Sequence, residues 1–416
     1  MKINLNIIKD FILHNKVFEN YFFMTVLKLI STFLGLLLYP YLISTLGMET
    51  YGKYIFAQAI TSFFIILVSF GFDLPNTKKI VENKDNLKTK SFILSGVFTS
   101  KLYLLFISII LFGLLLYLFR NEDISPIIFS ICFSQILGEL FFPVWYFRAI
   151  QKMKIVTYIQ LFFRLMTVPF ILIFIKAPEN LWIYALIMSL SIIFGGLVSM
   201  YIILKKYKLR LKLISIKSLK TFFKEASPFF WTNCIEAVKD QAATIIAGTF
   251  LGMSEVAIYD LAKKIIITPR IVTANINSAL YPKIIAENNK SKIKKIIFFE
   301  TIIGFSIVLL ISIFGYWIVI FLGGENMNFS YPVSIILSFT ILSWLVVGAY
   351  TNFIFIPSGH SYFITLNQSI ALIIFILACS LLFVHKNIIV ISFALSLSGV
   401  CEIFFCKYLT KKYSLL

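Results

Sequence analysis

Three ionisable residues stand in the middle of an otherwise apolar stretch, ASPFFWTNCIEAVKDQAATIIAGTFLG, at positions 226–252. Glu236 precedes Lys239 by three residues and Asp240 by four, which places all three on one face of a helix. Charged groups are costly inside a bilayer and usually line a wet cavity or pair with one another. Two interpretations stay open: the acids neutralise Lys239, or they bind a proton or Na+ while Lys239 contacts a ligand.

A second group of charges lies in the next apolar stretch. Asp260 precedes Lys263 and Lys264 by three and four residues, and Arg270 follows Lys263 by seven, so one helical face carries a polar column. Pro269 should bend the helix beside Arg270. A bent helix with a cationic stripe suits a diphosphate. The alternative is that Asp260 pairs with a lysine and the stripe only holds helices together.

Ionisable residues elsewhere in apolar stretches extend the set of candidates. Each costs on the order of 3 kcal/mol at the centre of a spanning helix, so those far from the helix ends are expected to face a polar cavity. The candidate substrate-binding cations are Lys28, Lys101, Arg164, Lys239, Lys263, Lys264 and Arg270. The candidate groups for ion or proton coupling are Glu236, Asp240 and Asp260. The 5 cysteines have no metal-ligand spacing, so we predict no metal site and no catalytic residue.

Composition defines the elements that must position these groups. The chain has 416 residues, of which 59% are hydrophobic and 14% charged, with a mean hydropathy of +0.92. A soluble core of this length could not bury so much apolar surface, so we predict an all-α integral membrane protein. Twelve spans are expected, at 21–43, 51–72, 91–119, 126–147, 155–175, 181–204, 226–251, 257–280, 296–322, 332–356, 363–384 and 388–409.

The cations between these spans predict the orientation of the chain. Lys and Arg gather in alternate connecting segments, and the opposite set holds only Arg120, Lys176 and Lys386. By the positive-inside rule, both termini face the cytoplasm. The net charge of +19 is therefore expected to serve the membrane surface and not a nucleic acid. Residues 1–20 lack a cleavable signal pattern and are predicted to form a cytoplasmic amphipathic helix.

An internal repeat divides the chain into related halves. LGMETYGKYIFAQAI at 46–60 aligns with LGMSEVAIYDLAKKI at 251–265, and the alignment continues without a gap. Six spans per half make the halves parallel, as in many secondary transporters, with the substrate path between two bundles. We predict an N-terminal six-helix bundle at 21–204, a basic cytoplasmic linker at 205–225 and a C-terminal six-helix bundle at 226–416.

Three stretches carry a family resemblance: LGMETYGKY at 46–54, FFPVWYFRAIQKMKIVTYI at 141–159, and Tyr281-Pro282. With the length and the six-plus-six layout, they resemble the Wzx-type lipid-linked oligosaccharide flippases, the O-antigen branch of the MATE-like MOP superfamily. The resemblance implies two pseudo-symmetric bundles that translocate undecaprenyl-diphosphate-linked repeat units to the outer leaflet of the bacterial plasma membrane, for O-antigen or capsule biosynthesis. It implies alternating access through a cationic central cavity. One departure is Phe147-Arg148-Ala149, where the family pattern has Gln-Gly, so the role of this loop is open.

Two other functions remain as alternatives. A MATE-type ion-coupled multidrug exporter would share the architecture, but its cavity should be acidic. A polymerase or ligase of the same pathway would need a larger outer loop with acids or His than the predicted GGENMNFSY at 323–331. No phosphate-binding loop of the full Gly-x-x-x-x-Gly-Lys-Ser/Thr type is present, since Tyr54 follows the Gly-Lys pair at 52–53. We therefore expect a transporter and not an enzyme, without a cofactor, coupled to Na+ or H+ if to any ion. Its expected partners are the lipid-linked oligosaccharide, membrane lipids and other polysaccharide assembly proteins.

Overall fold

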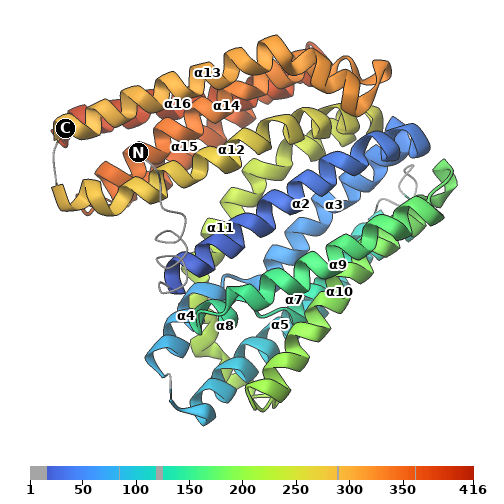
Figure 1. Ribbon diagram of the computed structural model, residues 1–416, viewed down its shortest axis with the longest axis vertical. Coiled ribbons are helices and arrows are strands. Elements are labelled where there is room, and N and C mark those ends of the chain that lie inside the picture. Colours follow the sequence, from blue (N-terminus) through green and yellow to red (C-terminus); the bar gives the residue numbers. More distant parts are fainter. Residues whose placement is uncertain (1–15, 84, 119–124, 288–289, 361) are drawn as a thin grey trace, which may run out of the picture. The chain divides into compact units, whose positions relative to one another are not determined.

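Helices form all the regular secondary structure that the computed structural model describes, in residues 16–83, 85–118, 125–287, 290–360 and 362–416. Figure 1 shows their course along the chain. The long elements are α2 (Lys16–Leu46), α3 (Met48–Ser69), α5 (Leu87–Leu118), α9 (Met153–Phe174), α10 (Leu181–Lys206), α11 (Ile216–Phe250), α12 (Met253–Glu287), α13 (Lys290–Gly323), α14 (Ser330–Tyr350), α15 (Tyr362–Cys379) and α16 (Ile388–Lys412). The predicted all-α class is confirmed.

Shorter elements connect or extend these helices. They are α4 (Asp73–Glu82), α6 (Pro126–Phe133), α7 (Ile136–Phe141), α8 (Val144–Ala149), the 3-10 turns η1 (Pro178–Asn180), η2 (Glu325–Met327) and η4 (Ser380–Phe383), and the π-helix η3 (Thr351–Phe355). The predicted amphipathic helix at 1–20 lies mostly outside the described residues. Its last residues, from Lys16, belong to α2, so that helix begins before the predicted span at 21–43.

Ten helical segments of the described chain are long and apolar enough to cross a membrane, which makes this a multi-pass membrane protein. They run Phe23–Leu46, Met48–Glu82, Leu87–Leu118, Pro126–Ala149, Met153–Phe174, Pro178–Lys206, Lys290–Gly323, Ser330–Phe355, Tyr362–Phe383 and Ile388–Lys412. The other two predicted spans, 226–251 and 257–280, lie in α11 and α12. Each of these helices has 35 residues, and α12 continues without interruption through Pro269.

The span predicted as one helix at 126–147 is instead divided into α6, α7 and α8. The first break is a tight turn, in which the main-chain N–H of Gln135 donates to the carbonyl of Cys132 over 3.0 Å. The second break falls at Pro143, which has no N–H to continue the helical hydrogen bonds. The predicted span itself is confirmed, because Pro126–Ala149 is long and apolar enough to cross a membrane, but its helix is interrupted at these two points.

Contacts between Cα atoms divide the chain into two compact units, which we describe separately. Unit 1 comprises residues 1–35 and 57–237, and unit 2 comprises residues 36–56 and 238–416. In unit 1, the aromatic run before Arg148 is core: Trp145 and Phe147 are fully buried in α8. The carbonyl of Trp145 accepts a hydrogen bond of 3.2 Å from Thr77 of α4. In unit 2, a core cluster gathers around α14, η3 and α16.

The two copies of the sequence repeat contact each other inside unit 2. Gly47 and Gly252 each end a helix with positive φ, of 77° and 117°, a conformation that favours glycine. The helices on either side of these two corners pack closely. A Cβ on Gly52 would lie 1.8 Å from the carbonyl oxygen of Met253, and one on Gly248 would lie 2.3 Å from the Phe56 ring. Only residues without a side chain allow this approach.

Candidate functional site

A buried ion pair lies in unit 1 between α5 and α7. The ammonium group of Lys101 lies 2.5 Å from Oε1 of Glu139 and also donates to the Glu139 carbonyl at 3.2 Å. Lys101 is only 2% exposed. A lysine so deeply buried needs a partner, because an uncompensated charge in the interior is strongly unfavourable. The structure thus gives Lys101, predicted as a cavity cation, a carboxylate that neutralises it.

Glu139 also borders a cavity of about 300 Å³ in unit 1, together with Arg164 of α9. Other polar residues on its wall are Ser31, Gln160 and Ser191, and the apolar ones include Phe142 and Phe163. Gln160 and Arg164 are four residues apart on α9, so they share a face of that helix. A guanidinium, an amide and two hydroxyls around one space can bind oxygen-rich groups such as phosphates and sugar hydroxyls.

Lys28 lies apart from the residues that line this cavity. It is an exposed residue of α2, and its carbonyl accepts a hydrogen bond of 2.9 Å from Thr32. Ser31, three residues further along α2, is the one that reaches the cavity wall. Charged residues in apolar stretches of the sequence identified Arg164 but not the uncharged polar residues of the cavity wall, Ser31, Gln160 and Ser191. The i, i+4 spacing of Gln160 and Arg164 was the available signal.

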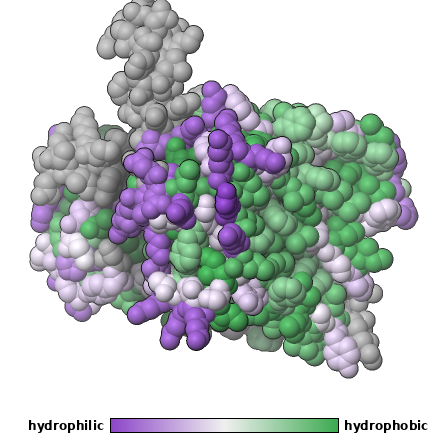
Figure 2. Space-filling view, turned by 90° about the horizontal axis from the view of Figure 1, so that it is seen from below, coloured by the Kyte–Doolittle hydropathy of each residue, from purple (hydrophilic) through white to green (hydrophobic). Residues whose placement is uncertain are grey.

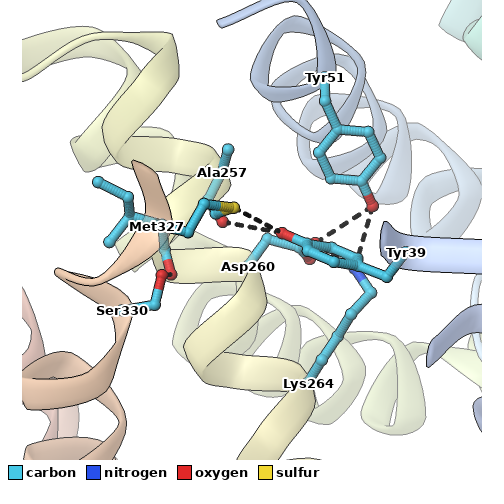
Figure 3. Close-up of polar contacts among 8 residues, drawn as sticks. Tyr39, Tyr51, Ala257, Asp260, Lys264, Met327 and Ser330 are labelled. Atoms are coloured by element: carbon cyan, nitrogen blue, oxygen red, sulfur yellow. Dashed lines mark hydrogen bonds and ion pairs between the residues drawn. The ribbon is translucent and has the colours of Figure 1, made fainter. Parts of the chain in front are cut away.

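In unit 2, Lys264 stands at the centre of a cluster with Asp260 and two tyrosines (Figure 3). Its ammonium group pairs with Oδ2 of Asp260, one turn earlier on α12, and donates to the Tyr51 hydroxyl at 3.2 Å. The Tyr51 hydroxyl in turn donates to the same Asp260 oxygen at 3.3 Å. The ring centroid of Tyr39 lies 5.0 Å from the ammonium group, within the range of a cation–π contact. The pairing of Asp260 with Lys264 was one of the two interpretations of the sequence.

The charged face of α11 finds its partners on other helices of unit 2. The ammonium group of Lys239 lies 2.5 Å from Oε1 of Glu402 on α16. Lys263 of α12 donates to the main-chain carbonyl of Asp240 at 2.8 Å. The side chain of Glu236, predicted on the same face, lies outside the described residues. The Glu402 partner was missed because it lies 163 positions from Lys239.

Arg270 packs against an aromatic ring, with its guanidinium carbon 5.0 Å from the ring centroid of Trp344 on α14. A planar guanidinium can stack on an aromatic face because its N–H groups point outward in the plane of the group. Each unit therefore contains an arginine within a helical bundle: Arg164 in unit 1 and Arg270 in unit 2. Guanidinium groups bind phosphates in two-point geometry, which suits them to a diphosphate.

Comparison with solved structures defines the class of this fold. It is similar to the lipid II flippase MurJ in an inward closed conformation, with a TM-score of 0.73 and 14% identity, covering 94% of this chain and 87% of that chain. It is also similar to an inward-facing multidrug resistance MATE family transporter of the MOP superfamily, with a TM-score of 0.61 and 12% identity, covering 92% and 98%. The MATE-like fold predicted from the sequence is thus confirmed.

The sequence itself belongs to the polysaccharide biosynthesis protein family, whose profile matches residues 17–286. Two curated relatives carry the name "Putative O-antigen transporter". The one from Escherichia coli (strain K12) is 25% identical over 302 residues, which cover 71% of this chain and 73% of that protein. The one from Shigella dysenteriae is 24% identical over 246 residues, covering 59% and 61%. The family resemblance found in the sequence is confirmed.

Proposed function

We propose that this protein is a flippase that translocates undecaprenyl-diphosphate-linked oligosaccharide repeat units from the inner to the outer leaflet of the bacterial plasma membrane, for surface polysaccharide biosynthesis. Membership of the polysaccharide biosynthesis family, the name of the two relatives and the fold shared with a lipid II flippase support it. The observation that carries the proposal is Arg164 on the wall of a cavity inside a membrane-spanning unit. A cation there has a clear use if the substrate carries a diphosphate.

The topology we propose has twelve spans and cytoplasmic termini. The ten apolar spans leave α11 and α12, each of which at about 1.5 Å per residue is roughly 50 Å long and exceeds the ~30 Å hydrocarbon core. Their charged residues hold partners on other helices, such as Lys239 with Glu402, and this lowers the cost of placing them in the membrane. Two six-helix bundles joined by a linker at 205–225 follow from this topology.

In the proposed mechanism, cationic side chains bind the diphosphate while the prenyl chain stays in lipid, and alternating access moves the headgroup outward. Arg164 and Arg270 are the proposed direct contacts, because guanidinium groups bind phosphate oxygens in pairs. Lys239 is paired with Glu402, and Lys264 with Asp260. In the proposed mechanism, these lysines exchange their carboxylate partners for the diphosphate when the substrate binds. With the cell interior negative, outward movement of two uncompensated negative charges is favoured by roughly 2 × 2.3 kcal/mol per 100 mV. Asp240, Asp260 and Glu236 are the groups we propose for coupling to Na+ or H+.

Ion-coupled drug export is the second candidate, because a multidrug MATE transporter has a similar fold. Such a pump should bind cations in an acidic pocket, whereas the unit 1 cavity presents Arg164, and the one acid that lines it, Glu139, is already paired with Lys101. The names of the relatives also support transport over a polymerase or ligase reaction.

The deciding experiment uses vesicles that contain the purified protein and a lipid-linked oligosaccharide. A membrane-impermeant glycosidase reports the appearance of the sugar on the outer leaflet. We expect Arg164→Ala to slow this exposure about 10- to 100-fold, as expected for a lost charge-assisted two-point contact. Lys176→Ala, which removes the exposed cation just beyond the end of the same helix, is the matched control and should behave as the native protein. Loss of a fluorescent cation from loaded vesicles, with no exposure of sugar, would instead establish drug export.

A further inference from the structure

The segment between α10 and α11 is an extended strap, although the sequence suggested only a basic linker. Residues 208–213 read KLRLKL, and this alternation of cations with leucines has the period of two that an extended chain requires. Leu209 is 3% exposed and Leu211 is half-buried, whereas Leu213 and the cations are exposed. The first two leucines of the strap therefore pack toward the helices of unit 1, and its charges face away from them.

A ladder of hydrogen bonds fixes the strap along α5. Three alternate main-chain N–H groups donate to three hydroxyls spaced four residues apart: Arg210 to Ser91 at 3.1 Å, Lys212 to Ser95 at 3.0 Å, and Ile214 to Thr99 at 3.3 Å. Ser95 also donates to the Arg210 carbonyl at 3.3 Å. Four residues of helix rise about 6 Å, and two residues of extended chain about 6.6 Å, so the two spacings match over this length. The strap is thus held in a defined register.

A groove of about 680 Å³ lies between the strap and the beginning of α5. Its polar wall consists of Lys88, Ser91, Ser95, Lys208, Arg210 and Lys212, and none of the described residues that line it is acidic. Its apolar rim is exposed: Leu87 to 53%, Phe92 to 49% and Leu213 to 72%. In Figure 2, hydrophilic side chains gather on the face seen from below, which is the end of unit 1 where α5 begins and α10 ends in Figure 1.

We propose that this groove binds the phosphate-bearing headgroup of an anionic phospholipid, separately from the transported substrate. Four cations without an acid among the residues that line the groove fit a phosphate, and the exposed apolar rim fits the first methylenes of the acyl chains. The hydrogen-bond ladder fixes the main chain that carries Arg210 and Lys212 before a lipid arrives, so little conformational entropy is lost on binding. An exposed basic helix would attract lipid only diffusely, whereas this groove should bind one headgroup.

The test measures binding of phosphatidylglycerol to the full-length protein in a neutral detergent by native mass spectrometry. The groove variant combines Lys208→Gln, Arg210→Gln and Lys212→Gln. Near a membrane each cation contributes about 1 kcal/mol of attraction, so the tightest phosphatidylglycerol site should weaken about 100-fold. The matched control removes the same charge from the adjacent exposed turns of α11, with Lys217→Gln, Lys220→Gln and Lys224→Gln. It should leave the tightest site within about threefold of native. Equal losses in the two variants would overturn the proposal.

A second variant separates the built groove from charge alone. Ser91→Ala, Ser95→Ala and Thr99→Val together keep every cation but remove the hydroxyls that hold the strap. We expect about tenfold weaker binding of phosphatidylglycerol, with a circular dichroism spectrum like that of the native protein. Native affinity in this variant would contradict a preformed groove.

Two further ligands identify what the groove binds. Phosphatidylcholine, which carries the phosphate but no net charge, should bind about tenfold more weakly than phosphatidylglycerol. Inorganic phosphate at millimolar concentration should leave phosphatidylglycerol bound, because it lacks contacts with Leu87, Phe92 and Leu213. Displacement of the lipid by phosphate alone would make the groove a site for free phosphate and would overturn the assignment to a phospholipid.

Discussion

The ammonium group of Lys101 and the carboxylate of Glu139 lie 2.5 Å apart inside unit 1, where the fourth span is divided into three short helices. The pair joins α5 to the six-residue α7, and Glu139 also borders the cavity that holds Arg164. A structural ion pair and a candidate binding residue thus share one wall.

Breaking this pair should destabilise unit 1 more than removing it completely. We expect Glu139→Gln or Lys101→Met to cost about 3 kcal/mol or more, because each leaves a buried charge or donor without its partner. The double variant should recover part of that loss. Thermal unfolding of the four proteins in detergent, followed by fluorescence, measures this coupling. Additive losses in the double variant would contradict a direct pairing.

Replacement of Arg164 by lysine separates charge from geometry in the unit 1 cavity. We expect Arg164→Lys to keep the positive charge but lose the two-point contact, so translocation should fall between the native rate and that of Arg164→Ala. Gln160→Ala, on the same face of α9, should have a smaller effect, because it removes a neutral hydrogen bond. The glycosidase assay ranks the variants. Equal rates for Arg164→Lys and Arg164→Ala would show that charge alone does not suffice.

Trp344 should act on translocation through Arg270. The stacked guanidinium predicts that Trp344→Leu reduces the rate severalfold, corresponding to the loss of about 1 kcal/mol of cation–π stabilisation. Trp344→Phe keeps an aromatic face and should be milder. Arg270→Ala should abolish translocation without loss of membrane insertion. In the Arg270→Ala background, Trp344→Leu should have little further effect on affinity for the lipid-linked substrate. If Trp344→Leu lowered this affinity as much in that background as in the native protein, Trp344 would not act through Arg270.

Tyr51 should orient the Asp260 and Lys264 pair in unit 2. Tyr51→Phe keeps the ring and removes only the hydroxyl that contacts both charged groups. We expect a loss of about 1.5 to 3 kcal/mol of stability, measured by thermal unfolding, as for a hydrogen bond to charged partners. Phe56→Leu, in the same helix but away from the charges, tests whether any change in α3 has the same effect. Thermal unfolding at several salt concentrations distinguishes the two variants, since only the stability lost in Tyr51→Phe should depend on the Asp260 charge.

Glycine at position 52 should be essential for the contact between the repeated corners. A Cβ there would meet the Met253 carbonyl at 1.8 Å, so Gly52→Ala requires movement of the main chain and should lower the unfolding temperature strongly. Gly35→Ala is the control, because nothing lies within 4 Å of its added Cβ and alanine favours helix. A stable Gly52→Ala protein would show that the corners can separate without cost.

The parts of the fold that followed from the sequence are those with local causes. The apolar spans were predictable from composition, and the pairing of Asp260 with Lys264 from a spacing of four residues. The first break in the fourth span, at Ser134 and Gln135, was not, because neither proline nor glycine marks it, whereas Pro143 at the second break was a local signal that the prediction did not use. The pairing of Lys239 with Glu402 likewise depends on which distant helices meet. Of the cavity wall, only the charged Arg164 stood out, since Ser31, Gln160 and Ser191 resemble any polar residues of a spanning helix.

Because of the hydrogen-bond ladder between the strap and α5, the length of the linker should be able to change only by an even number of residues. Inserting one residue within 208–214 would exchange the positions of cations and leucines, and would bring the wrong main-chain groups opposite the hydroxyls of α5. Inserting two would restore the alternation. Chimaeras that exchange segments between family members should therefore be joined after residue 214. The strap then stays in one segment with Ser91, Ser95 and Thr99, the residues that fix its register.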